Sequence, residues 1–218
     1  MSPATTTELT QLFADHGHRR VFRAGEVLFH ETDSSNEVFA CLSGRVRLVI
    51  AGAGGRELML DVKLPGDVFG ELSAIDGRGR STSAVAMEHT EVLEISGEQF
   101  LAVVRTDTAT CMAAMRALSY DLRRANARIC AGETEPVVTR AARLLLELAE
   151  RFADEGASGH LVWNVPITQT DLAEWLGATR EATARSLGTL RRAGLISTAR
   201  SCVTVHDRAA LAVVARPA

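Results

Sequence analysis

Between Arg19 and Ile95 the sequence is a series of short β-type runs separated by turn residues, and this pattern limits the fold more than any other feature. The runs alternate or cluster Val, Leu, Ile and Phe over a few residues, too short for an ordinary helix. They fall at Val21–Phe22, Val27–Phe29, Val38–Leu42, Val46–Ile50, Leu58–Leu60, Ala84–Ala86 and Val92–Ile95. Glycine-containing turns such as Ala24–Glu26, Ser43–Gly44 and Pro65–Asp67 separate them. Many short strands with such turns predict a β-sandwich or barrel.

One stretch inside this region has residue types suited to a small anion. It reads Phe69-Gly70-Glu71-Leu72-Ser73 and then, after six residues, Arg80-Ser81-Thr82-Ser83. Gly70 lets the backbone approach a ligand closely, and Arg80 can donate two charge-assisted hydrogen bonds to a phosphate. Glu71 accepts hydrogen bonds when ionised, so beside a phosphate it needs a hydroxyl donor such as a ribose. Arg80 is expected to meet the ligand in a loop rather than to pack in a core.

This spacing resembles the phosphate-binding cassette of cyclic-nucleotide-binding domains, in particular that of the bacterial CRP/FNR regulators. Gly25, Gly44 and Gly66 also stand where that family has turn glycines. The resemblance implies that Arg80, Ser81 and the Gly70 backbone bind a cyclic phosphate and that Glu71 binds the ribose. It implies cAMP as the first-choice effector. The alternative is a glycine-rich hairpin in which Arg80 only pairs with Glu71.

A long helical region is expected from Glu98 to about Ala131, with a kink near Thr106–Thr110. Apolar residues recur within it at steps of four and three, which is a heptad seam. The seam residues are Cys111, Met115, Leu118, Leu122, Ala125 and Ile129. Such a seam fits a two-helix homodimer contact, or else packing on the β domain of the same chain. In the family this helix forms the dimer interface, and the resemblance assigns adenine contacts to Ala125-Asn126, where Ala125 replaces a common Thr.

Gly132–Pro136 is the best linker in the sequence, because Gly and Pro enclose a short polar stretch. A strong helix, 138–152, and a strand, 161–165, are expected after it. Thr168-Gln169-Thr170-Asp171 then has the form of a capping box. The helix that it opens is followed by Gly177 and by a second helix capped by Thr179, which together predict a helix-turn-helix. Asp207 is expected to cap a last short helix that ends near Val214.

The second helix begins Thr179-Arg180-Glu181-Ala182-Thr183-Ala184-Arg185, so its first turns present two arginines and one glutamate. Arg is the commonest reader of guanine, and Glu can accept from the cytosine amino group. The alternative is a solvated helix face on which Glu181 and Arg185 form an i,i+4 pair. The helix-turn-helix frame and a hairpin at 194–205 favour DNA binding, and CRP-type recognition helices show the same R-E-(x3)-R pattern. The predicted DNA-binding residues are Thr168, Gln169, Thr179, Arg180, Glu181 and Arg185.

Charge distribution supports this assignment. The whole chain carries −3, but residues 165–200 hold five Arg and three acids, which gives +2 there and −5 elsewhere. The C-terminal part is therefore the one suited to approach phosphates. Four scattered cysteines and six scattered histidines form no metal-ligand pattern, so no metal is expected. No apolar run reaches the roughly 18 residues of a membrane span and no signal segment precedes the first domain, so a cytoplasmic protein without a membrane partner is expected.

These observations, together with what the family resemblance implies, predict an α+β protein in three parts. Residues 1–110 form a cyclic-nucleotide-binding β-roll of jelly-roll type, residues 111–135 a dimerisation helix and hinge, and residues 136–218 a winged helix-turn-helix. The predicted effector-binding residues are Gly70, Glu71, Leu72, Arg80, Ser81 and Asn126. The predicted function is a homodimeric regulator that binds palindromic double-stranded DNA under cAMP control.

The resemblance adds RNA polymerase as a partner and a TGTGA-like half-site. A regulator of the same fold that ignores cyclic nucleotides or senses another small molecule is the alternative. An enzyme is not expected, because catalytic motifs such as HExxH or GxxxxGK[ST] are absent from the sequence.

Overall fold

The computed structural model describes residues 13, 17–52, 57–152, 154–155, 161–164, 167–199 and 202–216. The chain forms two compact units, Met1–Ala125 and Asn126–Ala218. Leu9, Leu12 and Phe13 stand at helical spacing and predict a short lead helix over 8–14. This segment lies outside the described residues except for Phe13, which is helical and fully buried.

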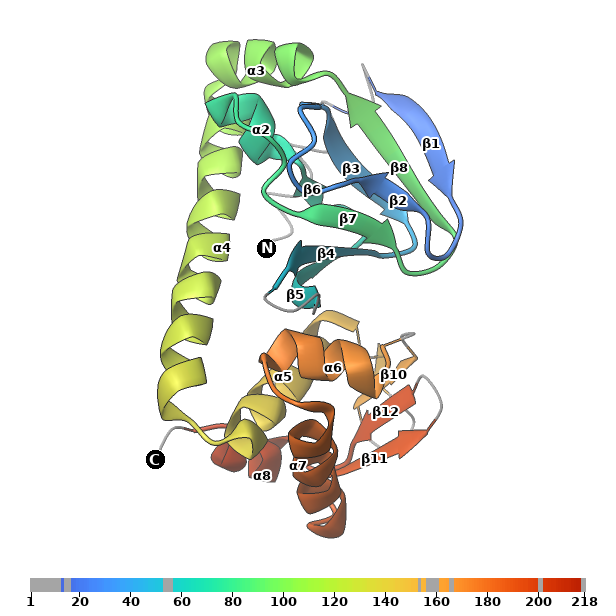
Figure 1. The fold of residues 1–218 in the computed structure, drawn as a ribbon, viewed down its shortest axis with the longest axis vertical. Helices are drawn as coiled ribbons and strands as arrows, with labels where there is room; N and C mark the ends of the chain where they lie inside the picture. Colours follow the sequence, from blue (N-terminus) through green and yellow to red (C-terminus); the bar gives the residue numbers. More distant parts are fainter. Residues whose placement is uncertain are drawn as a thin grey trace. The chain divides into compact units, whose positions relative to one another are not determined.

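The first unit is built on two four-stranded antiparallel sheets, as the short runs predict (Figure 1). One sheet has the strand order β1-β8-β3-β6 and the other β2-β7-β4-β5. Strand order that departs from sequence order in both sheets is the jelly-roll arrangement expected for this region. The strands are β1 (His18–Phe22), β2 (Val27–Phe29), β3 (Val38–Ser43), β4 (Val46–Ala51), β5 (Glu57–Lys63), β6 (Val68–Phe69), β7 (Ser83–Ala86) and β8 (Thr90–Ile95).

Aromatic and small apolar side chains from both sheets meet in one core. Phe29, Phe39 and Phe69 pack against one another, with ring centroids 5.4 to 6.4 Å apart. Ring pairs at these separations contribute beyond the area that they bury. Cys41 belongs to the same core, and burial raises the pKa of its thiol to about 12, so it acts as a packing residue.

Three helices cover the opposite face of the β1-β8-β3-β6 sheet. They are α2 (Glu71–Asp76), α3 (Gly97–Thr106) and the N-terminal part of α4 (Thr108–Thr134). Ala74, Phe100 and Ala114 from these helices pack against Val38, Ala40 and Ile95 of the sheet. Strand β3 is therefore buried on both faces, which explains its unbroken apolar sequence.

The long helical region differs from the expectation at two places, its middle and its C-terminal end. The expected kink is a complete break at Asp107, whose carboxylate accepts hydrogen bonds from the backbone N–H and hydroxyl of Thr110 at the start of α4. Helix α4 also continues through Gly132, Glu133 and Thr134, which were expected to be part of the linker. A single glycine costs a helix only about 1 kcal/mol. Helix α5 (Val137–Phe152) begins directly after Pro136.

The second unit contains the expected helix-turn-helix. Helix α6 (Gln169–Leu176) ends at Gly177, which has a φ of 58°, and α7 (Arg180–Arg192) follows after Ala178 and Thr179. Strands β11 (Ile196–Ala199) and β12 (Cys202–Val205) form the wing and join a sheet with β10 (Leu161–Asn164) and β9 (Asp154–Glu155). Helix α8 (Arg208–Val214) is capped by Asp207, as predicted.

Candidate functional site

Gly70 forms a sharp corner between β6 and α2. Its φ of 83° lies in the left-handed region that favours glycine. A Cβ atom at this position would lie 2.9 Å from Arg80 Nη1 and 3.0 Å from the Glu37 carbonyl oxygen, so a side chain does not fit. Helix α2 was not expected from the sequence, and it ends at a second left-handed glycine, Gly77. The two glycines hold the segment in a tight loop that brings Arg80 back beside Gly70.

Arg80 is buried, with only 1% of its side chain exposed. Its Nε donates to Ser35 Oγ at 3.0 Å, its Nη1 to the Gly70 carbonyl at 2.8 Å and its Nη2 to Glu37 Oε2 at 3.1 Å. The guanidinium also lies 4.2 Å above the ring of Phe29, within cation–π distance.

The expectation that Arg80 stays out of the core is therefore wrong. Its ion pair is with Glu37 rather than with Glu71, so the simple hairpin alternative is not what forms either. Burial lowers the pKa of the Arg80 guanidinium and Glu37 opposes that shift, which leaves a charged group held by an internal counterion.

A cavity of about 90 Å³ opens beside this arginine. Five of the six residues predicted to bind an effector line it, namely Gly70, Glu71, Leu72, Arg80 and Ser81. Thr82 and Ser73 add two further hydroxyl groups to the lining. The sixth predicted residue, Asn126, is exposed on α4 and is not part of this lining. With Lys63 and Asp121 also in the lining, the cavity combines two cations, two acids and several hydroxyl groups.

Four charged residues next to this cavity were missed by the sequence analysis. Lys63, the last residue of β5, places its Nζ 3.0 Å from Asp61 Oδ2 and 3.4 Å from Oδ2 of Asp121 on α4. Arg124, also on α4, donates to the other Asp61 oxygen at 3.0 Å. Burial opposes the charge on Lys63, but Asp61 and Asp121 outweigh it and raise the pKa of the ammonium.

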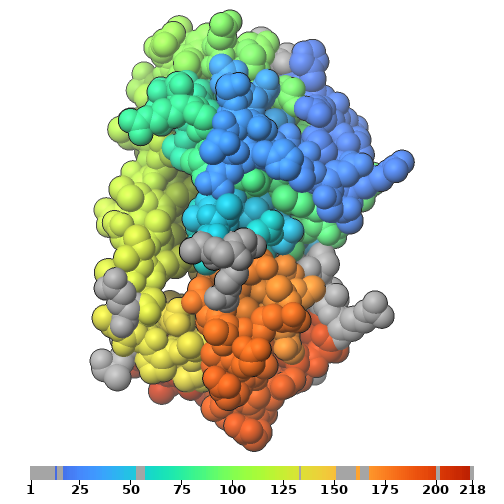
Figure 2. Space-filling model, viewed as in Figure 1, coloured from blue at the N-terminus to red at the C-terminus, as the bar shows by residue number. Residues whose placement is uncertain are grey.

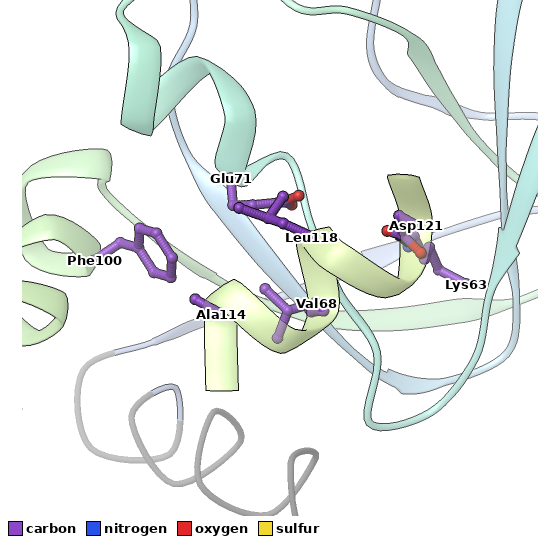
Figure 3. Close-up of a pocket in the computed structure, with 8 residues that line it drawn as sticks. Lys63, Val68, Glu71, Phe100, Ala114, Leu118 and Asp121 are labelled. Atoms are coloured by element: carbon purple, nitrogen blue, oxygen red, sulfur yellow. Dashed lines mark hydrogen bonds and ion pairs between the residues drawn. The ribbon is translucent and has the colours of Figure 1, made fainter. Parts of the chain in front are cut away.

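Lys63 and Asp121 also line a second, smaller cavity together with Glu71 (Figure 3). Burial raises the pKa of the Glu71 carboxyl, while Lys63, its own backbone N–H and Arg80 oppose that rise. A sequence signal for Lys63 did exist, because it is the only lysine in the chain.

The predicted dimerisation seam has two different environments along α4. Met115, Leu122 and Ile129 are 55%, 62% and 64% exposed, whereas Leu118 is half-buried and lines the cavity that contains Glu71. In the space-filling view, α4 lies uncovered along one edge of the first unit (Figure 2). The exposed part of the seam is thus an unpartnered apolar stripe, and Leu118 also packs on its own β domain.

The helix-turn-helix is shaped by two threonine caps. Thr168 Oγ1 accepts from the Asp171 backbone N–H at 3.1 Å, and Asp171 Oδ2 accepts from the Thr168 backbone N–H at 2.6 Å, which completes the predicted capping box. Thr179 Oγ1 accepts from the Ala182 backbone N–H at 3.2 Å and begins α7. The side chains of Thr183, Ser186, Leu187 and Leu190 form the buried face of α7.

Exposed charges occupy the other face of α7. Arg180, Glu181 and Arg185 are exposed, as are Thr168, Gln169 and Thr179. Hydrogen bonds from its own backbone N–H and from the Thr179 hydroxyl lower the pKa of Glu181, with smaller contributions from Arg185 and Arg180, so this carboxylate is an acceptor at neutral pH. Arg191 is different, because its Nη1 donates to Thr198 Oγ1 of the wing at 3.0 Å.

Neither a metal site nor a membrane-spanning helix is present among the described residues. Within the described ranges, no cluster of three or more His, Cys, Asp and Glu is arranged to hold a metal ion. None of the helices in the described part of the chain is long and apolar enough to span a membrane.

Comparisons with known proteins agree with both units. Residues 19–107 match the family model of the cyclic nucleotide-binding domain, and residues 139–214 match that of the Crp-like helix-turn-helix domain. The chain is 31% identical to the cyclic AMP receptor protein of Thermus thermophilus, over 95% of this chain and 93% of that protein. It is 28% identical to a CRP-like cAMP-activated global transcriptional regulator of Mycobacterium tuberculosis, over 89% and 87% of the two chains.

The solved structure of FixK2 from Bradyrhizobium japonicum has the same fold, with a TM-score of 0.82 at 24% identity and with 93% and 98% of the two chains covered. The fold, the two matched domains and the exposed recognition helix define a DNA-binding transcription regulator rather than an enzyme. The chain belongs to the CRP/FNR family of transcription regulators.

Proposed function

We propose that this regulator is controlled by cAMP, which binds in the cavity beside Arg80. The observation that carries this proposal is the gathering of Gly70, Glu71, Leu72, Arg80 and Ser81 around one cavity. Arg80 and Ser81 would bind the cyclic phosphate with the Gly70 backbone, and Glu71 would accept from the ribose hydroxyl. The family resemblance gives Asn126 the adenine, where its amide offers both a donor and an acceptor.

Nucleotide binding in this cavity requires side chains to move. Its volume of about 90 Å³ is below the roughly 300 Å³ at which ligand pockets usually begin. Glu37 is the side chain best placed to give way, because 39% of it is exposed and it holds Arg80 through one ion pair. A phosphate that takes the place of Glu37 would keep the charge on Arg80 compensated. The Glu37 side chain would then rotate outward into the solvent.

The alternative is a regulator of the same fold that does not depend on a cyclic nucleotide or that senses another small effector. One observation favours it: all three guanidinium nitrogens of Arg80 already donate to Ser35, Gly70 and Glu37. An arginine that is satisfied within the protein can be kept for packing and hydrogen bonding alone. Arg80 by itself therefore does not decide between the two functions.

We further propose that the protein acts in the cytoplasm as a homodimer on palindromic DNA, with RNA polymerase as its partner. The exposed stripe of Met115, Leu122 and Ile129 supports the dimer, because large apolar side chains at heptad spacing are stabilised by burial against a second helix. A two-fold dimer presents two copies of α7 and so fits a site with two-fold symmetry. Arg180, Glu181 and Arg185 would read bases there, and Thr168, Gln169 and Thr179 would contact the DNA nearby.

Calorimetric titration with cAMP and with cGMP tests the effector. The titration should show saturable binding of one cAMP per chain and weaker binding of cGMP. In a separate DNA-binding assay, addition of cAMP should change the affinity for DNA, either upward or downward. Glu71→Gln is the matched variant, because it keeps the size of the side chain and removes the carboxylate. Wild-type protein that binds its DNA equally well with and without cAMP, and gives no calorimetric signal, would favour the effector-independent alternative.

A further inference from the structure

Lys63 differs in type from every other basic residue of this chain. The sequence contains 24 basic residues, and Lys63 is the only lysine among them. It is also buried, with 7% of the residue exposed, at the end of β5 opposite Val46 of β4. Burying an ammonium is costly unless it is paired, so a lone buried lysine in an arginine-rich chain needs a specific explanation.

The contacts of Lys63 join two parts of the first unit. Asp61, its neighbour on β5, is shared with Arg124, so Asp61 retains a counterion without Lys63. Asp121 belongs to α4 and is 42% exposed. Glu71 faces the same two cavities as Lys63 and Asp121, and its charge interacts with both of them. The Lys63 ammonium therefore lies near both Glu71 of the pocket and Asp121 of α4.

We propose that Lys63 is a positioning residue of the effector pocket, and that its ammonium is the counterion shared between Glu71 in the pocket and Asp121 on α4. For its effect on ligand binding this inference rests on the cyclic-nucleotide function proposed above. A lysine suits the role better than an arginine, because its point charge on a flexible stem can shift between two acceptors.

Because Glu71 and Asp121 share the Lys63 ammonium, ligand binding in the pocket and the position of α4 should depend on each other. A ribose hydroxyl that donates to Glu71 favours the ionised carboxylate and so draws the Lys63 ammonium toward the pocket. The Lys63–Asp121 contact, already long at 3.4 Å, then weakens. By reciprocity, loss of the Asp121 charge makes Lys63 more available to Glu71 and should tighten ligand binding.

The expected pH dependence of ligand binding follows from the charged groups that act on Glu71 and Lys63. Lys63, Arg80 and Asp121 act on Glu71, while Asp61, Asp67, Asp121 and Glu71 act on Lys63. Burial raises the pKa of Glu71 and Lys63 lowers it. Removal of Lys63 should therefore raise that pKa further, and binding that needs the ionised carboxylate should be lost at a higher pH as the solution is acidified.

The single lysine permits a test without any ligand. Lysine-selective ¹³C and ¹⁵N labelling gives one side-chain signal, which can be followed by NMR from about pH 4 to 8. The signal should shift as Glu71 titrates, lose that shift in Glu71→Gln and show it at lower pH in Asp121→Asn. A Lys63 signal that has the same pH dependence in wild type and Glu71→Gln would overturn the shared counterion.

Calorimetry with cAMP at several pH values is the second arm, applied to wild type, Lys63→Met, Lys63→Arg and Asp121→Asn. Lys63→Met should weaken cAMP binding most at acidic pH, by about tenfold for each unit by which it raises the Glu71 pKa, and the loss should shrink toward alkaline pH, where Glu71 is ionised in both proteins. Lys63→Arg should recover part of the affinity, and Asp121→Asn should bind at least as tightly as wild type.

An equal loss at every pH in Lys63→Met, accompanied by a lower Tm, would reduce Lys63 to a structural residue. If wild type fails to bind cAMP at all, the proposed effector is wrong, and the NMR titration alone still decides the role of Lys63.

Discussion

Arg80 and Arg180 are both arginines assigned to phosphates or bases, yet they have opposite environments. The Arg80 side chain is 1% exposed, donates through all three nitrogens to its own chain and lies over Phe29. Arg180 is exposed at the first position of α7. The first arginine would have to exchange an existing partner to bind a ligand, whereas the second would meet DNA with a side chain that is already exposed.

The difference separates two ways of building an ionic recognition site. A buried site is rigid and selective, but each of its charges carries an internal counterion, so substitution there disturbs folding and binding together. An exposed site contributes little to stability, because surface charges are strongly screened. Binding and stability should therefore change together in the pocket and separately on the recognition helix.

The largest effect is expected on α4, where the same contrast occurs within one seam. Leu122→Glu should abolish the dimer, because a charge buried against its symmetry mate costs about 3 to 5 kcal/mol. Sedimentation velocity measures the change. Ala127→Glu is the control, since it places the same charge on an exposed position about 140° around the helix. Leu118→Glu should in addition impair nucleotide binding, because Leu118 lines the cavity beside Glu71. A Leu122→Glu variant that remains dimeric would place the interface elsewhere.

Arg80→Ala should have the next largest effect, and it tests the buried side of the contrast. Loss of a bidentate charge-assisted contact should weaken cAMP binding by about 2 to 3 kcal/mol. The Tm should also fall, because the guanidinium fills space over Phe29 and satisfies the Gly70 carbonyl. Arg180→Ala is the matched surface variant and should leave stability unchanged within about 0.5 kcal/mol. Equal melting temperatures for wild type and Arg80→Ala would show that Arg80, like Arg180, does not contribute to stability.

Base reading on α7 is the third effect, and it should appear without any change in stability. Replacing Arg180, Glu181 or Arg185 by Ala should cost about 1 to 3 kcal/mol at one base position and relax the preference there. Arg191→Ala should instead weaken binding to all sequences and reduce the salt slope by about one. Selection from a random DNA pool at fixed salt distinguishes them. An Arg180→Ala variant with unchanged sequence preference would make Arg180 a phosphate contact or a solvated side chain.

Local patterns predicted those parts of the fold that depend on neighbouring residues. Strand β4 and the cap at Thr168 follow from alternation and from a hydroxyl followed by an acid, and both form as expected. Helix α2 was missed, because its six residues have little helical periodicity and the helix is delimited by the left-handed glycines Gly70 and Gly77. The end of α4 was misplaced, because one glycine was read as a stronger break than it is.

The pocket was predictable in its composition but not in its charge pairing. The spacing of Gly70, Glu71 and Arg80 placed them together, yet nothing local connects Arg80 with Glu37, which is 43 residues away. The contact between Lys63 and Asp121 spans 58 residues and depends on where α4 packs. Such long-range ion pairs arise from tertiary packing, which periodicity and spacing do not report.

The smallest expected effect concerns the caps of the helix-turn-helix, and it sharpens the contrast by separating stability from DNA contact at one exposed residue. Thr168→Ala should cost about 1 kcal/mol, because the Asp171 backbone N–H loses its acceptor. For a chain of this size that corresponds to a fall in Tm of about 2 to 4 °C. Thr168→Ser should restore the Tm, since its hydroxyl can cap in the same way. If DNA affinity recovers in Thr168→Ser together with the Tm, Thr168 acts through the cap or through its hydroxyl. If Thr168→Ala leaves both Tm and DNA affinity unchanged, neither role holds, and Thr168 is only a solvated side chain.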